Sequence, residues 1–437
     1  MEYLPNIIFA IILVIGIGYF ARNIKKLIRN IKLGQEVDAS DNKSQRWINV
    51  LRIALGQSKM VKRPVSGFLH VIVYVGFVII NIEVLEIIID GIFGTHRIGQ
   101  EILSESVYGF LIGAFEILAI LVLVSVIVFW LRRNVIKVKR FLSSEMKGWP
   151  KNDGNIILYF EVVLMCLFLV MNATDSSFQE MGIGNVISQY ISPWFEGFSE
   201  GTIHTVERTA WWLHIVGILI FLNYLYFSKH LHILLAFPNV YLGSVEPKGK
   251  FNNLEAVTNE VKLMMDPDAD PYAAPAETAE NEVPAKFGAS DVMDLNQIQL
   301  LNAYTCTECG RCTSACPANL TGKKLSPRKI MMDTRDRLEE VGKNIDANNG
   351  EFKDDGKQLL GDYITNEELW ACTTCNACVE ECPVSINPLS IILEMRRYLV
   401  MEQSAAPMEL NNMMTNIENN GAPWPYNQMD RLNWKDE

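Results

Sequence analysis

Two stretches of the sequence repeat the same spacing of four cysteines followed by a proline. The first holds Cys306, Cys309, Cys312 and Cys316, and the second holds Cys372, Cys375, Cys378 and Cys382. Three thiolates at intervals of three residues bind one face of a [4Fe–4S] cube, and in two-cluster domains the fourth cysteine of each run binds the other cube. The spacing therefore predicts one cluster on Cys306, Cys309, Cys312 and Cys382, and a second on Cys372, Cys375, Cys378 and Cys316.

Two other uses of these cysteines compete with iron. Zinc binds paired Cys-x-x-Cys units, but it would leave the third cysteine and the following proline of each run without a role. Disulfides are typical of secreted chains. The N-terminus begins Met1-Glu2-Tyr3 and lacks the basic start of a secretory signal peptide, so we expect reduced thiolates. The ninth cysteine, Cys166, lies in an apolar run and is expected to be a small buried side chain.

All six histidines lie in or beside the apolar first half of the chain: His70, His96, His204, His214, His230 and His232. An imidazole inside a membrane is costly unless it has a function, although interfacial histidines bonded to neighbouring helices are the structural alternative. We expect His70 near the start of the second apolar segment and His232 at the end of the fifth, on the same side of the membrane. These two imidazoles are therefore the first candidates for axial ligands of a b-type haem.

His214 precedes His232 by five helical turns, about 27 Å along one face of the fifth helix, and His230 is expected to point the opposite way. A second haem would need a partner for His214, either His96 or His204 from an outer loop. Without such a partner, His214 is expected in a quinone pocket.

Carboxylates also occur within the apolar segments. They are Glu83, Glu86 and Asp90 at helical spacing in the second segment, Glu116 in the third and Glu161 in the fourth. Carboxylates at membrane depth often carry protons, which quinone chemistry requires. We expect Asp90 and Glu161 to be interfacial, and Glu83, Glu86 and Glu116 to be the candidates for proton transfer.

The elements that position these residues fall into two unlike halves of a 437-residue chain with a net charge of −11. Five segments in the first half are apolar over the roughly 17–25 residues that a membrane-spanning helix needs. They run from Leu4 to Phe20, Val65 to Phe93, Val107 to Leu131, Asn155 to Met171 and Thr209 to Phe227. Lys and Arg gather between the first and second segments and after the third, whereas residues 172–205 contain none. The basic loops are expected to face the cytoplasm of a bacterial inner membrane, and the second half of the chain with them.

The fold class predicted is all-α. Residues 1–240 are expected to form a five-helix, cytochrome b-like membrane bundle, and residues 241–293 an extended linker whose acidic, Pro- and Ala-rich part has no packed core. Residues 294–402 are expected to form a cytoplasmic helical ferredoxin domain with two clusters. In this domain, Asp294 would cap a short helix leading to Cys306.

Residues 403–437 form a tail with exposed-type aromatic side chains, Trp424, Tyr426 and Trp434. Such side chains are common anchors at protein interfaces, so the tail is a candidate docking segment for a partner. The alternative is that the aromatic rings fold back onto the ferredoxin domain.

The cysteine stretches resemble a known family over residues 294–401. "CTECGRCTSACPANLTGKKLSPRKI" and "LWACTTCNACVEECPVSINPLSIILEMRRYLV" are similar to the iron–sulfur subunit of heterodisulfide reductase and to related membrane-associated iron–sulfur oxidoreductases. The first half resembles the cytochrome b subunit of respiratory nitrate reductase in its five helices, in His70 followed by "VIVYVGF", and in the His214/His232 pair with Pro238 beyond it. These resemblances imply haem b and quinone chemistry in the membrane, coupled to iron–sulfur clusters.

Two departures from these families affect the interpretation. The cytochrome family has two histidines ten residues apart on its second helix, whereas Ile80 stands at the second position here. A second haem would therefore need another ligand, such as His96. Single-chain relatives continue into a catalytic domain with Cys-Cys-Gly motifs, and no cysteine follows Cys382 in this sequence. The catalytic chemistry is therefore expected on a separate subunit, either a Cys-Cys-Gly protein or an electron-transferring flavoprotein.

The sequence thus predicts an electron-transfer subunit of a quinone-linked membrane oxidoreductase, similar to heterodisulfide reductase. It would relay electrons between a cytoplasmic redox partner and membrane quinone through two clusters and the His70/His232 haem, with no role for nucleic acid. The alternative is a redox-inert membrane anchor without haem, in which the clusters are structural. The direction of electron flow does not follow from the sequence, because reduction potentials depend on the contacts around each cofactor.

Overall fold

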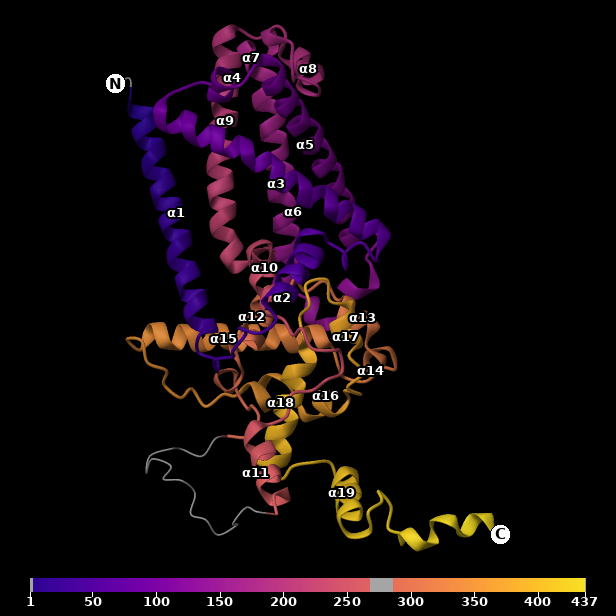
Figure 1. The fold of residues 1–437 in the computed structure, drawn as a ribbon. Coiled ribbons are helices and arrows are strands. Elements are labelled where there is room, and N and C mark those ends of the chain that lie inside the picture. The colour runs from indigo at the N-terminus through magenta and orange to yellow at the C-terminus, as the bar shows by residue number, and fades with distance from the viewer. Residues whose placement is uncertain (1–2, 268–285, 437) are drawn as a thin grey trace.

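The computed structural model describes residues 3–267 and 286–436. Within these ranges the chain is helical and contains no β-sheet, which confirms the all-α prediction. Most of the acidic linker predicted to be extended, residues 268–285, lies outside the described residues. Figure 1 shows a long helical bundle at one end of the molecule and a group of shorter helices at the other.

Five helices of the bundle are long and apolar enough to cross a membrane. They are α1 (Leu4–Ile31), α3 (Pro64–Phe93), α5 (Glu105–Asn134), α6 (Trp149–Thr174) and α9 (Glu200–Tyr224). Several of them extend well beyond the predicted apolar segments, because backbone hydrogen bonds continue through the flanking polar residues. α1 continues eleven residues past Phe20 in this way. The apolar run marks the part suited to hydrocarbon, not the ends of the helix.

Close packing in the bundle involves α3, α5, α6 and α9. Gly76 of α3 lies against α5 so closely that a Cβ there would approach Val122 to 2.5 Å. Small residues of this kind let membrane helices pack tightly. α1 stands at the edge of the bundle in Figure 1, and many of its apolar side chains are exposed. Three short helices, α4 (Ile98–Ile102), α7 (Ser176–Met181) and α8 (Ser188–Ile191), cover the outer end.

The fifth long helix ends before His232. α9 is followed by a 3-10 turn to Phe227, and Ser228 has extended backbone angles. The Ser228 hydroxyl accepts a hydrogen bond from the backbone N–H of His230, which starts a new turn that leads into α10 (His232–Leu242). The prediction that His214 and His232 share one helix face is therefore wrong, because a serine side chain stops the helix between them.

The shorter helices form the ferredoxin domain and pack directly beneath the bundle. They are α12 (Gln297–Thr305), α13 (Arg311–Ala315), α14 (Pro317–Leu320), α15 (Pro327–Ala347), α16 (Asn366–Trp370), α17 (Ala377–Glu381) and α18 (Pro388–Met401). α12 is capped by Asn296, and Asp294 belongs to the preceding 3-10 turn, so the predicted cap is wrong by two residues. Asn296 prevails because its side chain and that of Gln299 satisfy each other's backbone N–H groups.

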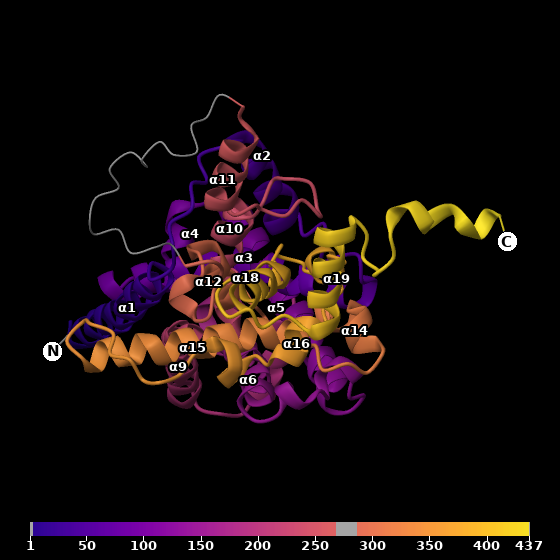
Figure 2. The same ribbon diagram turned by 90° about the horizontal axis from the view of Figure 1, so that it is seen from below.

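The two halves of the chain share one hydrophobic core. Leu27 of α1, Phe221 of α9 and Leu231 are buried in the same cluster as the core of the ferredoxin domain. α15 runs across the lower end of the bundle in Figures 1 and 2. There the Lys26 ammonium of α1 donates to the Asp346 carboxylate of α15 at 2.6 Å. The ferredoxin domain is therefore fixed to the bundle by direct packing, with help from α2 (Lys43–Asn49), a π-helical turn (Val50–Leu55) and α10.

Two peripheral helices, α11 (Glu255–Met265) and α19 (Met408–Asn420), lie outside this core. The tail after α19 extends away from the ferredoxin domain in Figure 2, and Trp424, Tyr426 and Trp434 are exposed. The structure thus does not fold these rings back onto the domain. Cys166, predicted to be buried, is exposed on the surface of α6, because that face of the helix has no neighbouring helix against it.

Candidate functional site

The two cysteine loops have the same backbone shape. Cys306 ends α12 and Cys372 follows α16; two and four residues after each of them the backbone turns left-handed, at Glu308 and Gly310 in the first loop and at Thr374 and Asn376 in the second. Gly310 and Asn376 are residue types that tolerate this conformation. The repeated spacing in the sequence is therefore also a repeated turn, which directs successive cysteines toward one centre.

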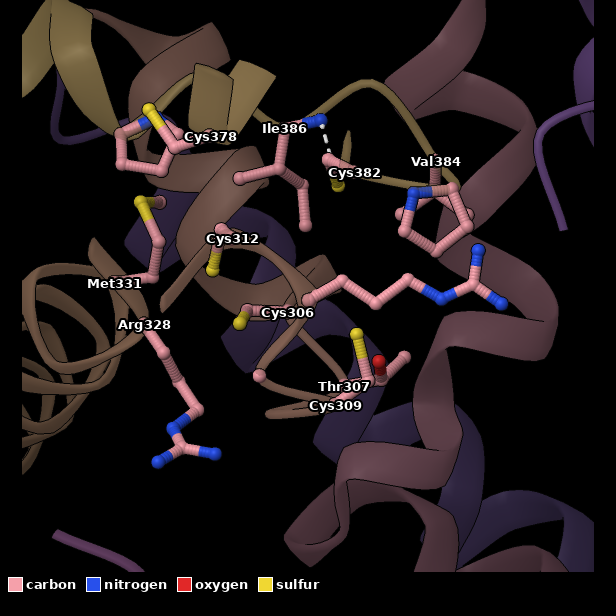
Figure 3. A pocket seen from close by; sticks show the side chains of 14 residues that line it. Cys306, Thr307, Cys309, Cys312, Arg328, Met331, Cys378, Cys382, Val384 and Ile386 are labelled. Carbon is pink, nitrogen blue, oxygen red and sulfur yellow. Dashed lines mark hydrogen bonds between the residues drawn. The ribbon is translucent and has the colours of Figure 1, made fainter. Parts of the chain in front are cut away.

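The structure brings the cysteines together in two groups. Figure 3 shows the first group, whose sulfur atoms face a common space. This inner cysteine site consists of Cys306, Cys309, Cys312 and Cys382. The outer cysteine site consists of Cys372, Cys375, Cys378 and Cys316. The fourth cysteine of each run thus lies with the first three of the other run, which is the arrangement that the spacing predicts.

The chemistry of both cysteine groups suits iron. Burial raises the pKa of Cys306 and of Cys378 to about 12, and that of Cys382 to about 11. Such thiols stay protonated at neutral pH until a bound cation stabilises the thiolate. Among the described residues, no three His, Cys, Asp or Glu side chains converge on one ion. A [4Fe–4S] cube does not require that, because each thiolate binds a different iron.

Backbone N–H groups also point at the sulfur atoms. The N–H of Ile386 lies 3.2 Å from Cys382 Sγ, and the N–H of Thr374 lies 3.4 Å from Cys372 Sγ. Hydrogen bonds to cluster sulfurs are one of the ways in which a protein sets the potential of a cluster.

Two contacts connect the inner cysteine site to the segments that carry His70 and His232. Glu308, between Cys306 and Cys309, forms an ion pair with Lys229, three residues before His232. Arg311, between Cys309 and Cys312, donates to the backbone carbonyls of Lys59 and Met60 at 3.1 and 3.0 Å, just before α3. The loop that holds these cysteines is therefore in contact with both histidine-bearing segments.

His70 and His232 face each other beside this loop. Their ring centroids are 6.3 Å apart, with an angle of 42° between the planes. An axial imidazole nitrogen lies roughly 2 Å from its metal and the ring centre about 1 Å further, so two axial histidines have centroids about 6 Å apart. His232 Nδ1 is bonded to the Lys229 carbonyl at 3.2 Å, which leaves Nε2 for a metal. His70 Nδ1 is buried and has no hydrogen-bond partner among the described residues.

His230 lies next to this pair instead of pointing away from it. Its ring is 5.4 Å from that of His232, edge to face. The sequence prediction assumed a continuous helix through both residues, and the break at Ser228 changes the direction of His230.

His214 and the two outer-loop histidines are not brought together. His214 is 2% exposed, and its Nδ1 is bonded to the Leu164 carbonyl at 3.1 Å. His96 instead contacts Ser177 and Asp175, at 3.1 and 3.3 Å. Asp175 lies eleven residues after Leu164 along α6, about 16 Å along the helix axis. His96 is therefore too distant to be the axial partner of His214.

His204 is exposed on α9, ten residues before His214 and thus about 15 Å away along the same helix. Neither histidine predicted as a partner lies opposite His214.

A buried polar network lies at the outer end of the bundle. Arg97, which is 7% exposed, donates to Asp175 at 2.7 Å and to Asn172 at 2.8 Å. Asn172 in turn donates to Glu116 at 3.1 Å, and Glu116 also accepts from two backbone N–H groups of the loop before α8. Sequence reasoning identified Glu116 but missed Arg97. The signal was available, because Arg97 is the single basic residue between the second and third apolar segments.

The remaining carboxylates differ in their surroundings. Glu86 accepts from the Gly99 N–H at 2.9 Å and from the Tyr108 hydroxyl at 3.1 Å. Glu83 is 4% exposed, and its Oε2 atom has no hydrogen-bond partner in the described part of the chain. Glu161 lies near the middle of α6 and not at an interface, because this helix begins at Trp149, before the predicted start.

Comparisons with known proteins agree with the cysteine geometry. Residues 305–386 match the family model of the 4Fe–4S dicluster domain. Over 99% of its length, the chain is 30% identical to the probable iron–sulfur-binding oxidoreductase FadF of Bacillus subtilis, of which it covers 61%. It is 26% identical, over 92% of its length, to the EtfAB:quinone oxidoreductase of Syntrophomonas wolfei, of which it covers 55%.

One component of a CoB–CoM heterodisulfide reductase from Methanosarcina acetivorans is 34% identical over 27% of the chain and 60% of that component. The chain thus spans between half and two thirds of the length of these relatives. No solved structure matches it.

These findings define the class of protein. The chain is an iron–sulfur electron-transfer protein with a 4Fe–4S dicluster domain, homologous to iron–sulfur oxidoreductases and heterodisulfide reductase subunits. Its five long apolar helices associate this domain with a membrane. The resemblance of the first half to a nitrate reductase cytochrome b stays a prediction.

Proposed function

We propose that the chain relays electrons between a cytoplasmic redox partner and membrane quinone, as the electron-transfer part of a membrane-bound oxidoreductase. The observation that carries this proposal is the pair of facing histidines, His70 and His232, in direct structural contact with a four-cysteine loop. A relative named as an EtfAB:quinone oxidoreductase over nearly the whole chain supports both ends of the relay. The partner would be an electron-transferring flavoprotein or a Cys-Cys-Gly subunit.

Each group of residues has a role in this proposal. The inner and outer cysteine sites would each hold a [4Fe–4S] cluster, and His70 and His232 would hold one b-type haem. When bound, these groups take up and release single electrons. Cys375 of the outer site is exposed, so this side is the accessible one for a soluble partner. We propose a single haem, because neither His96 nor His204 faces His214.

The location follows from charge and geometry. Basic residues of the loop before α3 and of the loop after α5 contact the ferredoxin domain, for example Arg63 with Glu381 at 2.9 Å. Since basic loops remain in the cytoplasm, we propose that the ferredoxin domain lies on the cytoplasmic side of a bacterial inner membrane. The outer polar network of Glu83, Glu86 and Glu116 would then exchange quinone protons at the opposite end.

The proposal is tested on the purified full chain in detergent. About eight non-haem irons and one haem per chain are expected, together with a b-type absorption band after reduction by dithionite. His70→Ala and His232→Ala should each abolish that band while keeping the iron–sulfur absorbance. His214→Ala, the matched control, should keep the band. Reduced electron-transferring flavoprotein should drive reduction of a soluble quinone analogue by the unmodified protein but not by the first two variants.

The opposite results would support a redox-inert anchor. A chain that retains about eight irons but has no haem and does not reduce quinone would contradict the relay. Stoichiometric zinc in place of iron would contradict the cluster assignment itself.

A further inference from the structure

Three cationic side chains surround the inner cysteine site and pair with no carboxylate among the described residues. They are Lys59, Arg140 and Arg311. The Lys59 ammonium donates to the Cys382 carbonyl at 3.3 Å and to the Ser385 hydroxyl at 3.4 Å. Lys59 belongs to the loop before α3, so the membrane half supplies this charge to the ferredoxin domain.

Arg311 and Arg140 approach the same site from two other directions. Arg311 is 3% exposed, and its guanidinium is held by the backbone carbonyls before α3 and by no carboxylate. Arg140 lies beside Gly310, where an added Cβ would come within 3.5 Å of the Arg140 Cβ. The Nε atom of Arg140 is buried and has no hydrogen-bond partner in the described ranges. Its guanidinium lies within electrostatic range of Cys309.

The other charges near the inner site are compensated. Glu308 lies between Lys229 and Arg335. Arg328 is fully buried and pairs with Glu145 at 2.6 Å. Of the charged groups described around this site, the three unpaired cations therefore supply its local excess of positive charge.

The outer cysteine site is different. One unpaired cation, Arg396, contacts it in the described structure, through hydrogen bonds to the carbonyls of Leu369 and Cys372 at 2.6 Å each. Arg396 also stacks on Trp370. Cys375 is exposed, so water screens charge at this end. The two sites thus have similar ligand geometry but unlike electrostatic surroundings.

These surroundings decide where an added electron is more stable. A cluster with four thiolates becomes more negative when it gains an electron, and burial alone opposes that change. Nearby cations favour it, and they act most strongly where water is excluded. All three cations lie at the buried site, where burial would otherwise make electron uptake harder.

We propose that Lys59, Arg140 and Arg311 raise the reduction potential of the inner site above that of the outer site, and so direct electrons inward, toward the membrane. This inference rests on the proposed relay. In each transfer one electron leaves the outer site, which is oxidised, and enters the inner site, which is reduced; no bond or proton moves. The electron comes from a reduced soluble flavoprotein at the outer site. It leaves toward His70 and His232.

The test is a redox titration of the purified full chain, followed by electron paramagnetic resonance of the two clusters. Cys375→Ser, a ligand exchange at the outer site, assigns the two signals. The unmodified protein should show the higher potential at the inner site. Lys59→Gln and Arg140→Gln should each weaken electron uptake at that site about tenfold, or about 59 mV for one electron, and leave the outer site unchanged.

Matched variants separate charge from structure. Lys59→Arg keeps the charge and should keep the potential. Lys62→Gln, in the same loop, removes an exposed lysine paired with Glu380 and should have no effect. Arg396→Gln should lower the outer potential alone. If Lys59→Gln loses iron, Lys59→Met serves as a second uncharged variant with a similar stem.

Two results would overturn the inference. One is a higher potential at the outer site of the unmodified protein, and the other is an inner potential that does not respond to Lys59→Gln or Arg140→Gln. Quinone reduction could still be observed in both cases, so the proposed relay would stand. Absence of both cluster signals, together with absence of the b-type band, would instead overturn the relay and this inference with it.

Discussion

The ion pair between Lys229 and Glu308 joins the cysteine loop to the turn that carries His232, and its removal is the most informative perturbation of this junction. The Lys229 side chain is 10% exposed and that of Glu308 is 3% exposed. Lys229 also donates to the Pro150 carbonyl at 2.6 Å, which ties the same ammonium to α6. Lys229→Met keeps the apolar stem of the side chain and removes the charge.

The structure sets the size of the expected effect. Burial alone would raise the pKa of Glu308, but the charges of Lys229 and Arg335 bring it below its ordinary value. Removing one partner of a buried ion pair costs about 3–5 kcal/mol. Arg335 remains bonded to Glu308 at 2.8 Å, so the lower figure, about 3 kcal/mol, applies. This free energy corresponds to roughly a 100-fold increase in the equilibrium constant for opening the loop.

Iron release to a chelator measures this opening, because its rate follows the population of the open state when reclosing is fast. Lys229→Met should release iron roughly 100-fold faster than the unmodified protein. Glu308→Gln should have a smaller effect, and the double variant less than the sum of the two, because the residues interact. Lys62→Met, which removes an exposed pair, is the control and should change the rate only a few-fold. Equal rates for Lys229→Met and Lys62→Met would refute this reasoning.

Three further predictions concern other contacts. Arg337→Met should destabilise the ferredoxin domain by about 3 kcal/mol, measured by denaturant-induced loss of iron–sulfur absorbance, because this fully buried guanidinium pairs with two aspartates. Gly342→Ala should weaken docking of α15 on α1 by about 1–3 kcal/mol, seen as faster proteolysis at the junction, since its Cβ would lie 2.5 Å from the Asn30 amide. Burial alone would raise the pKa of Asp175, but hydrogen-bonded neighbours, among them Arg97, hold it well below its ordinary value. Its contribution to stability is therefore present above about pH 4 and lost as the pH falls further, so the Tm of Asp175→Asn should fall less on acidification than that of the unmodified protein.

The helical class and the grouping of the cysteines were predictable because both depend on local patterns. An apolar run of sufficient length must be helical in a membrane, whatever its neighbours. The repeated spacing of Cys306, Cys309 and Cys312 fixes three sulfur atoms by one turn of the chain, and the second motif repeats that turn. The proximity of His70 and His232 was also anticipated, although from a helix geometry that the structure does not have.

The break at Ser228 could not be predicted, because it depends on groups that are distant in the sequence. The apolar pattern continues through "LYFSKHLHILLAF", and nothing in it marks an end of the helix. In the structure, Asp153 of α6 accepts a hydrogen bond from the Lys229 N–H at 3.2 Å, and the Ser228 hydroxyl satisfies the N–H of His230. The cap at Asn296 and the network around Arg97 likewise depend on side chains that meet only after folding.

The position of Cys382 among Cys306, Cys309 and Cys312 has a consequence for biosynthesis. A ribosome that has translated the first motif has supplied only three sulfur atoms for the inner site, and 66 residues separate Cys316 from the missing one (382 minus 316). The nascent chain can therefore insert its long helices into the lipid before either iron centre is complete. Cofactor delivery must wait for synthesis of the second motif, so maturation of the two centres is a single late event.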